Sequence, residues 1–230
     1  MRGGTCMTWL EQGEKLWNEN ASFWSNGSKH MWDNGSRSGV VPFMKKYVPQ
    51  GANILDVGCG DGYGSYLLAK EGYNVVGMDY SGEMVNTATG HNKEKNVSFV
   101  KGDMCHMPFE DGTFASIMAI TSVEWTESPL QAVQEFYRVL EDGGKCCVAI
   151  LGPTAKPRER SYQRLYGEKV VCNTMMPWEF GRLACENGFV HIDGYGVYKR
   201  GVEEICIADL SISLKQSLSF MWVFMLEKKA

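Results

Sequence analysis

The stretch NILDVGCGDGYG, residues 53–64, decides the fold class of this chain. A short apolar run contains the carboxylate Asp56, and a glycine-rich turn follows before a helical pattern begins. This is how a strand passes into a helix whose N-terminus faces a ligand. A second carboxylate, Asp79, ends the next apolar run about 20 residues later, the spacing expected of a residue that binds ribose hydroxyls. We therefore expect a site for a nucleoside-containing cofactor.

Apolar runs and helical patterns alternate from this turn onward. Strands are expected at residues 54–57, 75–78, 97–100, 114–120 and 146–151, with two closing strands around 190–198 and 218–226. Helices are expected at residues 65–70, 82–91, 129–140 and 177–187, the third one ended by Gly143-Gly144. The alternation predicts an α/β fold, a doubly wound and mostly parallel seven-stranded sheet with helices on both faces.

Two segments lie outside this alternation. Residues 1–48 are expected to form a helical cap, with polar interruptions at Asn26–Ser28 and Asn34–Ser36. The cap would either pack on the edge of the sheet or cover a ligand. The remaining domain, residues 49–230, carries an insertion at 152–178 after the fifth strand, and this insertion is a candidate lid.

The composition limits the classes of partner that we expect for this protein. The net charge of −4 and the pI of about 5.6 do not suggest binding to nucleic acid, which normally requires a basic patch. The apolar tract at 218–226 is too short for a membrane span, and residues 1–10 lack the apolar core of a signal peptide. None of the 8 cysteines forms a Cys-x-x-Cys pair. We expect a cytoplasmic protein with reduced cysteines and no metal site.

The turn itself argues against a dinucleotide. The dinucleotide fingerprint requires glycine at position 63, where this chain has Tyr63. Asp56 would repel a pyrophosphate but attract an ammonium and a sulfonium, which are the two cations of S-adenosylmethionine. Asp56 could instead cap nearby amides at the end of the strand.

Four segments resemble class I S-adenosylmethionine-dependent methyltransferases of the type 11 branch, which includes enzymes of ubiquinone and menaquinone biosynthesis. Residues 54–62 resemble the first motif, 76–81 the ribose-binding strand end, 99–109 the adenine segment, and 127–144 the helix-and-turn signature. The match covers roughly residues 50–150. It implies a Rossmann-like methyltransferase fold with S-adenosyl-L-methionine as the cofactor, and it does not identify the acceptor.

The resemblance also implies residue roles around the methionine part of the cofactor. Asp56 would hold the ammonium, directly or through water. Gly58, Cys59 and Gly60 would offer their backbone to the methionyl and ribose parts. Thr121, after the fourth strand, would border the methionyl part.

Further roles concern the nucleoside and the carboxylate of the cofactor. Asp79 would accept both ribose hydroxyls, and Tyr80 would pack on the adenine. Asp103 would accept the adenine amino group, with the Met104 amide nearby. Arg37 is a candidate donor to the cofactor carboxylate, although it could instead be an exposed residue of a helix, which is the interpretation that the sequence favours.

The residues that would bind the methyl acceptor are less clearly defined by the sequence. Many relatives carry His where this chain has Trp125, so that side chain offers no base. The neighbouring Glu124 is either a general base or a solvated turn residue. The candidates to line an acceptor pocket are aromatic, and each could instead be core packing: Trp24, Trp32, Trp125, Tyr162, Tyr166 and Trp178.

The sequence therefore predicts an S-adenosylmethionine-dependent methyltransferase that acts on a small molecule. Two other hypotheses stay open. One is a non-catalytic module that binds S-adenosylmethionine as a sensor. The other is a nicotinamide-dependent oxidoreductase, which Asp56 and Tyr63 disfavour.

Overall fold

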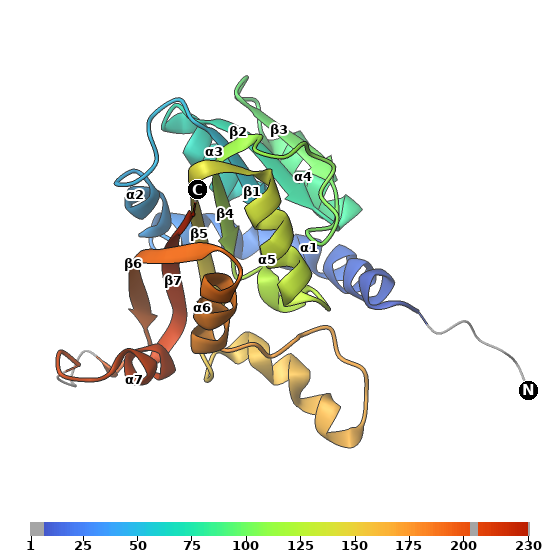
Figure 1. Ribbon diagram of the computed structural model, residues 1–230. Helices are drawn as coiled ribbons and strands as arrows, with labels where there is room; N and C mark the ends of the chain where they lie inside the picture. Colours follow the sequence, from blue (N-terminus) through green and yellow to red (C-terminus); the bar gives the residue numbers. More distant parts are fainter. Residues whose placement is uncertain (1–6, 203–206, 230) are drawn as a thin grey trace, which may run out of the picture.

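The computed structural model describes residues 7–202 and 207–229 and has a seven-stranded sheet at its centre (Figure 1). The strand order is β3-β2-β1-β4-β5-β7-β6; β7 pairs antiparallel with β5 and β6, and the other pairs are parallel. This confirms the predicted doubly wound, mostly parallel fold. The strands are β1 (Asn53–Val57), β2 (Asn74–Asp79), β3 (Val97–Lys101), β4 (Phe114–Ile120), β5 (Leu140–Leu151), β6 (Phe189–Tyr198) and β7 (Ser219–Lys228).

Helices cover both faces of the sheet, so its central strands are buried on both sides. Along β4, Ile117 and Ala119 pack into one core together with α5 and α6, whereas Met118 and Ile120 pack into the other together with α2 and α3. The helices are α2 (Val40–Met44), α3 (Tyr63–Lys70), α4 (Gly82–His91), α5 (Pro129–Val139), α6 (Pro177–Glu186) and α7 (Ile212–Ser217).

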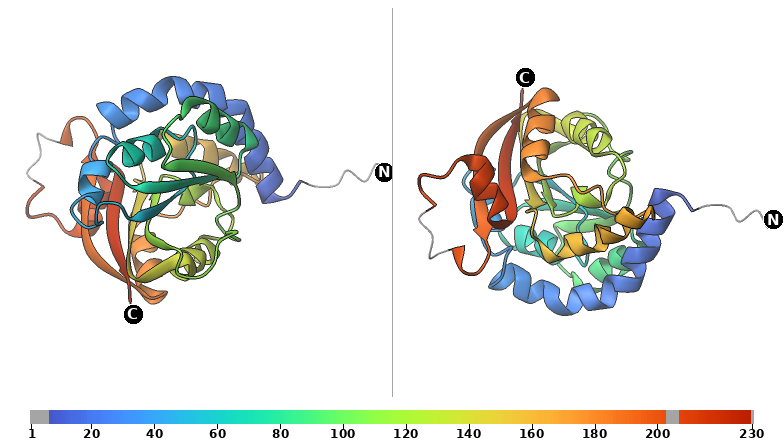
Figure 2. Two further views of the ribbon diagram at one scale, coloured as in Figure 1. Left: turned by 90° about the horizontal axis from the view of Figure 1, so that it is seen from above. Right: turned by 90° about the horizontal axis from the view of Figure 1, so that it is seen from below.

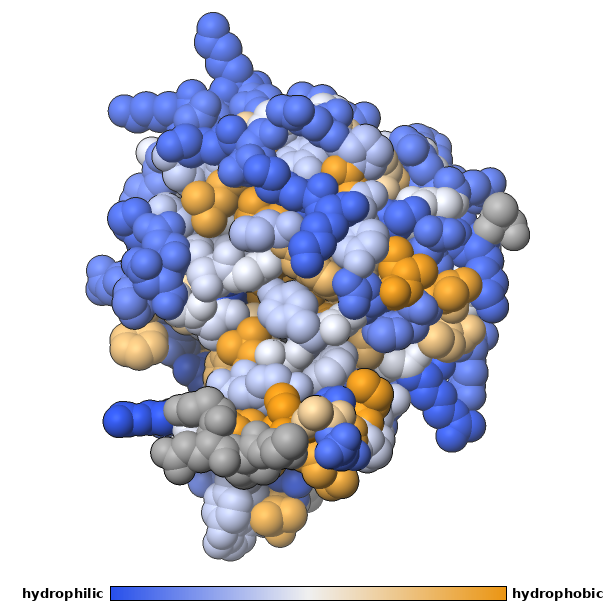
Figure 3. Space-filling view, turned by 90° about the vertical axis from the view of Figure 1, so that its left-hand side faces the viewer, coloured by the Kyte–Doolittle hydropathy of each residue, from blue (hydrophilic) through white to orange (hydrophobic). Residues whose placement is uncertain are grey.

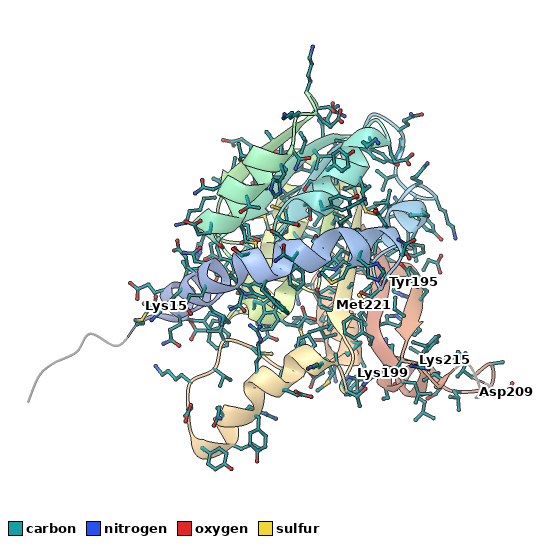
Figure 4. All side chains as sticks on the ribbon, turned by 180° about the vertical axis from the view of Figure 1, so that it is seen from behind. Lys15, Tyr195, Lys199, Asp209, Lys215 and Met221 are labelled. Carbon is teal, nitrogen blue, oxygen red and sulfur yellow. The ribbon has the colours of Figure 1, made fainter. Side chains whose placement is uncertain are left out.

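The N-terminal cap is built on one long helix, α1 (Trp9–Asp33), which begins in a capping box between Thr8 and Glu11. The interruption expected at Asn26–Ser28 is wrong, because the helix continues through it and Ser28 donates a 2.8 Å hydrogen bond to Asp61. The interruption at Asn34–Ser36 does end the helix. Figures 2 and 4 show α1 crossing the molecule beside α3 and α4.

A glycine lets α1 approach α3 closely. Trp32, on the last turn of α1, is buried against the second core. A Cβ added to Gly64 of α3 would lie 2.4 Å from the Trp32 ring. Trp32 is therefore a packing residue between two helices, and the expectation that it lines an acceptor pocket is wrong.

The chain after β4 departs from the sequence expectations in two places. Helix α5 ends at Val139 and β5 begins at once, so the glycine pair at 143 and 144 lies inside the strand and does not stop the helix. The insertion contains a 3₁₀ helix, η2 (Lys156–Tyr166), and α7 comes before the last strand. On the face over β6 and α7, hydrophobic residues form separate patches among hydrophilic ones (Figure 3).

The contact between α1 and α3 can be tested with two glycine substitutions. Gly64→Ala forces a Cβ into the Trp32 ring and should lower the free energy of unfolding by about 1–3 kcal/mol. Gly90→Ala is the matched control, because nothing lies within 4 Å of its added Cβ in α4, and it should raise stability by up to about 1 kcal/mol. Urea unfolding measures both. Equal stability of the two variants would contradict this packing.

Candidate functional site

The glycine turn after β1 has a backbone that other residues rarely adopt. Gly58, Gly60 and Gly62 have φ angles of 70°, 57° and 77°. The amides of Gly58 and Cys59 donate to the carbonyl of Met78 at 2.8 and 3.1 Å, which fastens the turn to the end of β2. A Cβ on Gly58 would lie 2.4 Å from the Cβ of Ser122. The turn is thus held in a fixed position beside the ends of β2 and β4.

Asp79 connects this turn to the start of α4. Its two carboxylate oxygens accept 2.9 Å hydrogen bonds from the amides of Gly60 and Ser81. Burial raises the pKa of Asp79 to about 6, although these backbone hydrogen bonds favour the charged form. Each carboxylate oxygen has a second lone pair, so Asp79 can still accept hydrogen bonds from a ligand.

Asp56 lies behind the turn rather than beside open space. Its carboxylate accepts a 2.6 Å hydrogen bond from Ser65, and the side chain does not line the cavity in front of the turn. Burial raises the pKa of Asp56 to about 7, while the positive charge of Arg37 opposes that rise. Asp56 can therefore act on a ligand through its field or through water, and no direct contact is built for it.

Three connected cavities surround the turn. The inner cavity lies in front of Gly58, Cys59, Gly60 and Asp79. The side cavity shares Tyr80, Met104 and Trp125 with it. The outer cavity, of about 490 Å³, shares five residues with the inner one: Trp17, Trp24, Arg37, Thr121 and Trp125.

The side cavity contains the residues expected around an adenine. Asp103 lines it and accepts a 3.0 Å hydrogen bond from the Cys105 amide. The buried hydroxyl of Tyr80 has no hydrogen-bond partner among the described residues, and a Cβ on Gly13 of α1 would lie 2.8 Å from it. Helix α1 therefore presses on Tyr80 and sets the position of its ring.

A tryptophan cluster, formed by Trp17, Trp24 and Trp125, separates the inner from the outer cavity. The ring of Trp17 meets Trp24 and Trp125 edge-on, with centroids 5.5 and 5.2 Å apart. The indole of Trp125 donates to the Thr121 carbonyl at 2.9 Å, and the indole of Trp9 donates to the Trp125 carbonyl at 2.8 Å. These contacts fasten α1 to the loop after β4.

Arg37 lies in the turn between α1 and α2, so the alternative interpretation as an exposed helix residue is wrong. It is buried, donates a 2.8 Å hydrogen bond to the Thr121 hydroxyl and lies over the Trp24 ring at 4.8 Å. Burial lowers the pKa of Arg37 to about 10, which leaves it charged at neutral pH. Thr121 has a φ of 52°, a strained backbone for a β-branched residue, and such strain often marks a functional site.

Glu124 has neither of its two expected roles. It is fully buried, so it is not a solvated turn residue. One of its carboxylate oxygens accepts a 2.5 Å hydrogen bond from the Leu151 amide, and the side chain lines neither the inner nor the outer cavity. The geometry thus gives no support to a general base at this position; Glu124 ties the short helix η1 (Val123–Trp125) to the end of β5.

The structure gathers only part of the predicted aromatic pocket. Trp24 and Trp125 line the outer cavity, but Tyr162, Tyr166 and Trp178 are exposed and lie outside it. Sequence reasoning missed lining residues that come from distant segments: Trp17, Phe23, Arg160 and Phe220. For Trp17 a signal existed, since it is two helical turns from Trp24 and therefore on the same face of α1.

The charges around the inner cavity fit S-adenosylmethionine. The buried carboxylates Asp56, Asp61 and Asp79 surround the turn, and they favour a ligand that carries an ammonium and a sulfonium. Arg37 offers one buried cation for one carboxylate. Gly60 lines the inner cavity, and a Cβ at this position would lie 3.2 Å from the Trp24 indole nitrogen, so a larger residue would crowd Trp24.

Three further observations concern residues 7–202 and 207–229. In these ranges no group of three or more His, Cys, Asp or Glu side chains is arranged to hold a metal ion. Six cysteines of the described part are unpaired thiols. Over the same ranges, no helix has the length and apolar character needed to cross a membrane.

Sequence comparison identifies the same region. A family model described as "Methyltransferase domain" matches residues 55–148. Sterol 24-C-methyltransferase erg6 of Schizosaccharomyces pombe is 37% identical over 102 residues, covering 42% of this chain and 27% of that protein. A demethylmenaquinone methyltransferase of Beutenbergia cavernae is 32% identical over 117 residues, covering 51% and 47%. This chain thus spans about half or less of the length of these relatives.

Solved structures share the fold over a longer range. The [4+2]-cyclase SpnF superposes with a TM-score of 0.72 at 18% identity, covering 100% of both chains. An S-adenosylmethionine-dependent methyltransferase of Mesorhizobium loti superposes with a TM-score of 0.67 at 15% identity, covering 85% of this chain and 99% of that one. The identities are low, so these two structures support the fold. The family model covers residues 55–148, which contain the turn and its buried carboxylates. This segment therefore matches the methyltransferase domain family, and the match implies S-adenosylmethionine as the cofactor.

Proposed function

We propose that this chain is an enzyme that transfers a methyl group from S-adenosylmethionine to a small-molecule acceptor. The observation that carries this proposal is the wall of five residues shared by the inner and outer cavities. A donor in the inner cavity and an acceptor in the outer one would meet at Thr121 and Trp125. The outer cavity, of about 490 Å³, is large enough for a small molecule.

The proposed roles follow from the contacts of each residue. Asp79 accepts the ribose hydroxyls, and Asp103 accepts the adenine amino group in the side cavity. The Arg37 guanidinium, held by Thr121 and Trp24, binds the cofactor carboxylate. Asp56 stabilises the ammonium from behind the turn.

Methyl transfer requires mainly that the donor and the acceptor are aligned. Bound S-adenosylmethionine supplies a methyl group on a sulfonium, which is a good leaving group. Holding the two reactants in line for attack can supply about 7–11 kcal/mol of the barrier reduction. The tryptophan cluster excludes water from the junction of the two cavities, which favours a reaction that disperses charge.

The two other hypotheses differ in measurable ways. A sensor would bind S-adenosylmethionine without turnover on any acceptor, and the resemblance to a protein named a cyclase is a reason to measure turnover directly. An oxidoreductase would bind NAD and not S-adenosylmethionine. We also propose a cytoplasmic location, since the free thiols of the described chain suit a reducing compartment.

Titration calorimetry with S-adenosylmethionine tests the cofactor site. Asp79→Ala removes the acceptor of two ribose hydroxyls and should weaken binding by about tenfold or more. Asp209→Ala is the control, because that carboxylate is exposed on the segment before α7, away from the cavities (Figure 4). Circular dichroism checks that Asp79→Ala stays folded despite losing the Gly60 and Ser81 contacts. Undiminished affinity in a folded Asp79→Ala variant refutes the assignment.

The raised pKa of Asp56, about 7, predicts a pH dependence of cofactor binding. Below that pH the folded protein holds a proton on Asp56, so the attraction for the ammonium is lost. The Kd for S-adenosylmethionine should rise about tenfold from pH about 8 to pH about 5.5. Because the same proton is bound less tightly in the unfolded chain, the stability of the free protein should fall as pH rises from about 4 to about 7.

Asp56→Asn separates this effect from the titration of Asp79. The variant should keep only the dependence centred near pH 6, which belongs to Asp79. A wild-type Kd that stays constant over this pH range contradicts the role of Asp56.

A further inference from the structure

The outer cavity has a chemical character that differs from the surface of the chain. Its walls are apolar, with Phe23 and Trp24 from α1, Leu151 from the end of β5 and Phe220 from the start of β7. Phe23 is 78% exposed and marks the open side. Such walls favour a ligand with an apolar or aromatic body.

Positive charges collect around the same cavity. Arg37 lines it on the inside, Lys156 and Arg160 line it from η2, and Glu159 is the single carboxylate among the lining residues. Because Arg37 is assigned to the cofactor carboxylate, Lys156 and Arg160 against Glu159 leave a local charge of +1 for the acceptor, whereas the whole chain carries −4. The surplus is therefore a property of this site rather than of the composition.

Arg160 is held in place at the mouth of the cavity. Its guanidinium lies 5.8 Å from the Trp17 ring centroid, and it donates a 3.4 Å hydrogen bond to the Asn20 side chain. Both contacts reach from η2 to α1. The exposed Arg160 guanidinium therefore lies between the two elements that border the opening.

We propose that the outer cavity binds an amphipathic acid, a molecule with an apolar or aromatic body and one anionic group, and that Arg160 and Lys156 bind the anion at the mouth. This names the acceptor class and so rests on the proposed methyltransferase function. With the anion at η2, the opposite end of the acceptor lies toward Thr121 and Trp125, the wall shared with the inner cavity. The anion is an anchor and not the methylated group.

A pair of fluorescent probes tests the anchor. Anilinonaphthalene sulfonate is anionic and aromatic, and N-phenyl-naphthylamine is its neutral counterpart. The anionic probe should bind the wild-type protein more tightly, and Arg160→Ala should weaken it about threefold to tenfold without changing the neutral probe. Arg160→Lys keeps the charge and should stay within about twofold of wild type. Raising salt from about 50 mM to about 500 mM should weaken the anionic probe alone.

Two substitutions near Arg160 test whether the anionic probe binds at this position. Arg164→Ala removes a cation from the same η2 helix, but Arg164 lines a different cavity and the variant should bind both probes as wild type does. Glu159→Gln removes the carboxylate of the outer cavity and should strengthen the anionic probe. The proposal is overturned if Arg164→Ala weakens that probe as much as Arg160→Ala, or if the two probes respond alike.

Calorimetry with S-adenosylmethionine keeps this result separate from the proposed function. Arg160→Ala should bind the cofactor as wild type does, since Arg160 lines the outer and not the inner cavity. A wild-type protein that binds no cofactor refutes the methyltransferase proposal, whereas loss of discrimination between the probes refutes the acid anchor.

Discussion

The site depends on the attachment of the β1 turn to the end of β2. The amides of Gly58 and Cys59 donate to the Met78 carbonyl, and the Gly60 amide donates to the Asp79 carboxylate. These bonds form only if β1 and β2 pair in the observed parallel register, with Val57 opposite Met78. One register therefore sets the direction of the turn, the position of Asp79 and the front of the inner cavity. A slip of one residue would turn the side chains of one strand to the opposite face of the sheet relative to the other strand.

The parts of the site that sequence could predict are those held by local geometry. A strand, a turn and a helix follow one another without a gap from Asn53 to Lys70, so the position of the turn could be inferred from its own residues. The same applies to Asp79 and Asp103, which end consecutive apolar runs. Parallel strands bring such ends to one edge of the sheet.

The remaining parts depend on contacts between distant segments. Arg37 bonds to Thr121 across 84 positions, and Arg160 bonds to Asn20 across 140, so neither pairing leaves a pattern in the sequence. The exposure of these side chains could not be predicted from the sequence. Glu124, beside a polar turn, is fully buried, whereas Tyr162 and Tyr166 on η2 are exposed to solvent. Aromatic and charged residues of this kind take their role from the neighbour that covers them, and that neighbour is known only once the layers are assembled.

The hydrogen bond from Trp9 to Trp125 joins residues 116 positions apart, and it has a consequence for the order of folding. Helix α1 precedes its partners near residues 64 and 125, which come from α3 and from the loop after β4. Closing the longer of these loops is entropically costly until the sheet exists, so we expect the contacts of α1 with the loop after β4 to form late in folding. A ligand enclosed by α1 would add its binding energy to this step and stabilise the folded chain through mass action.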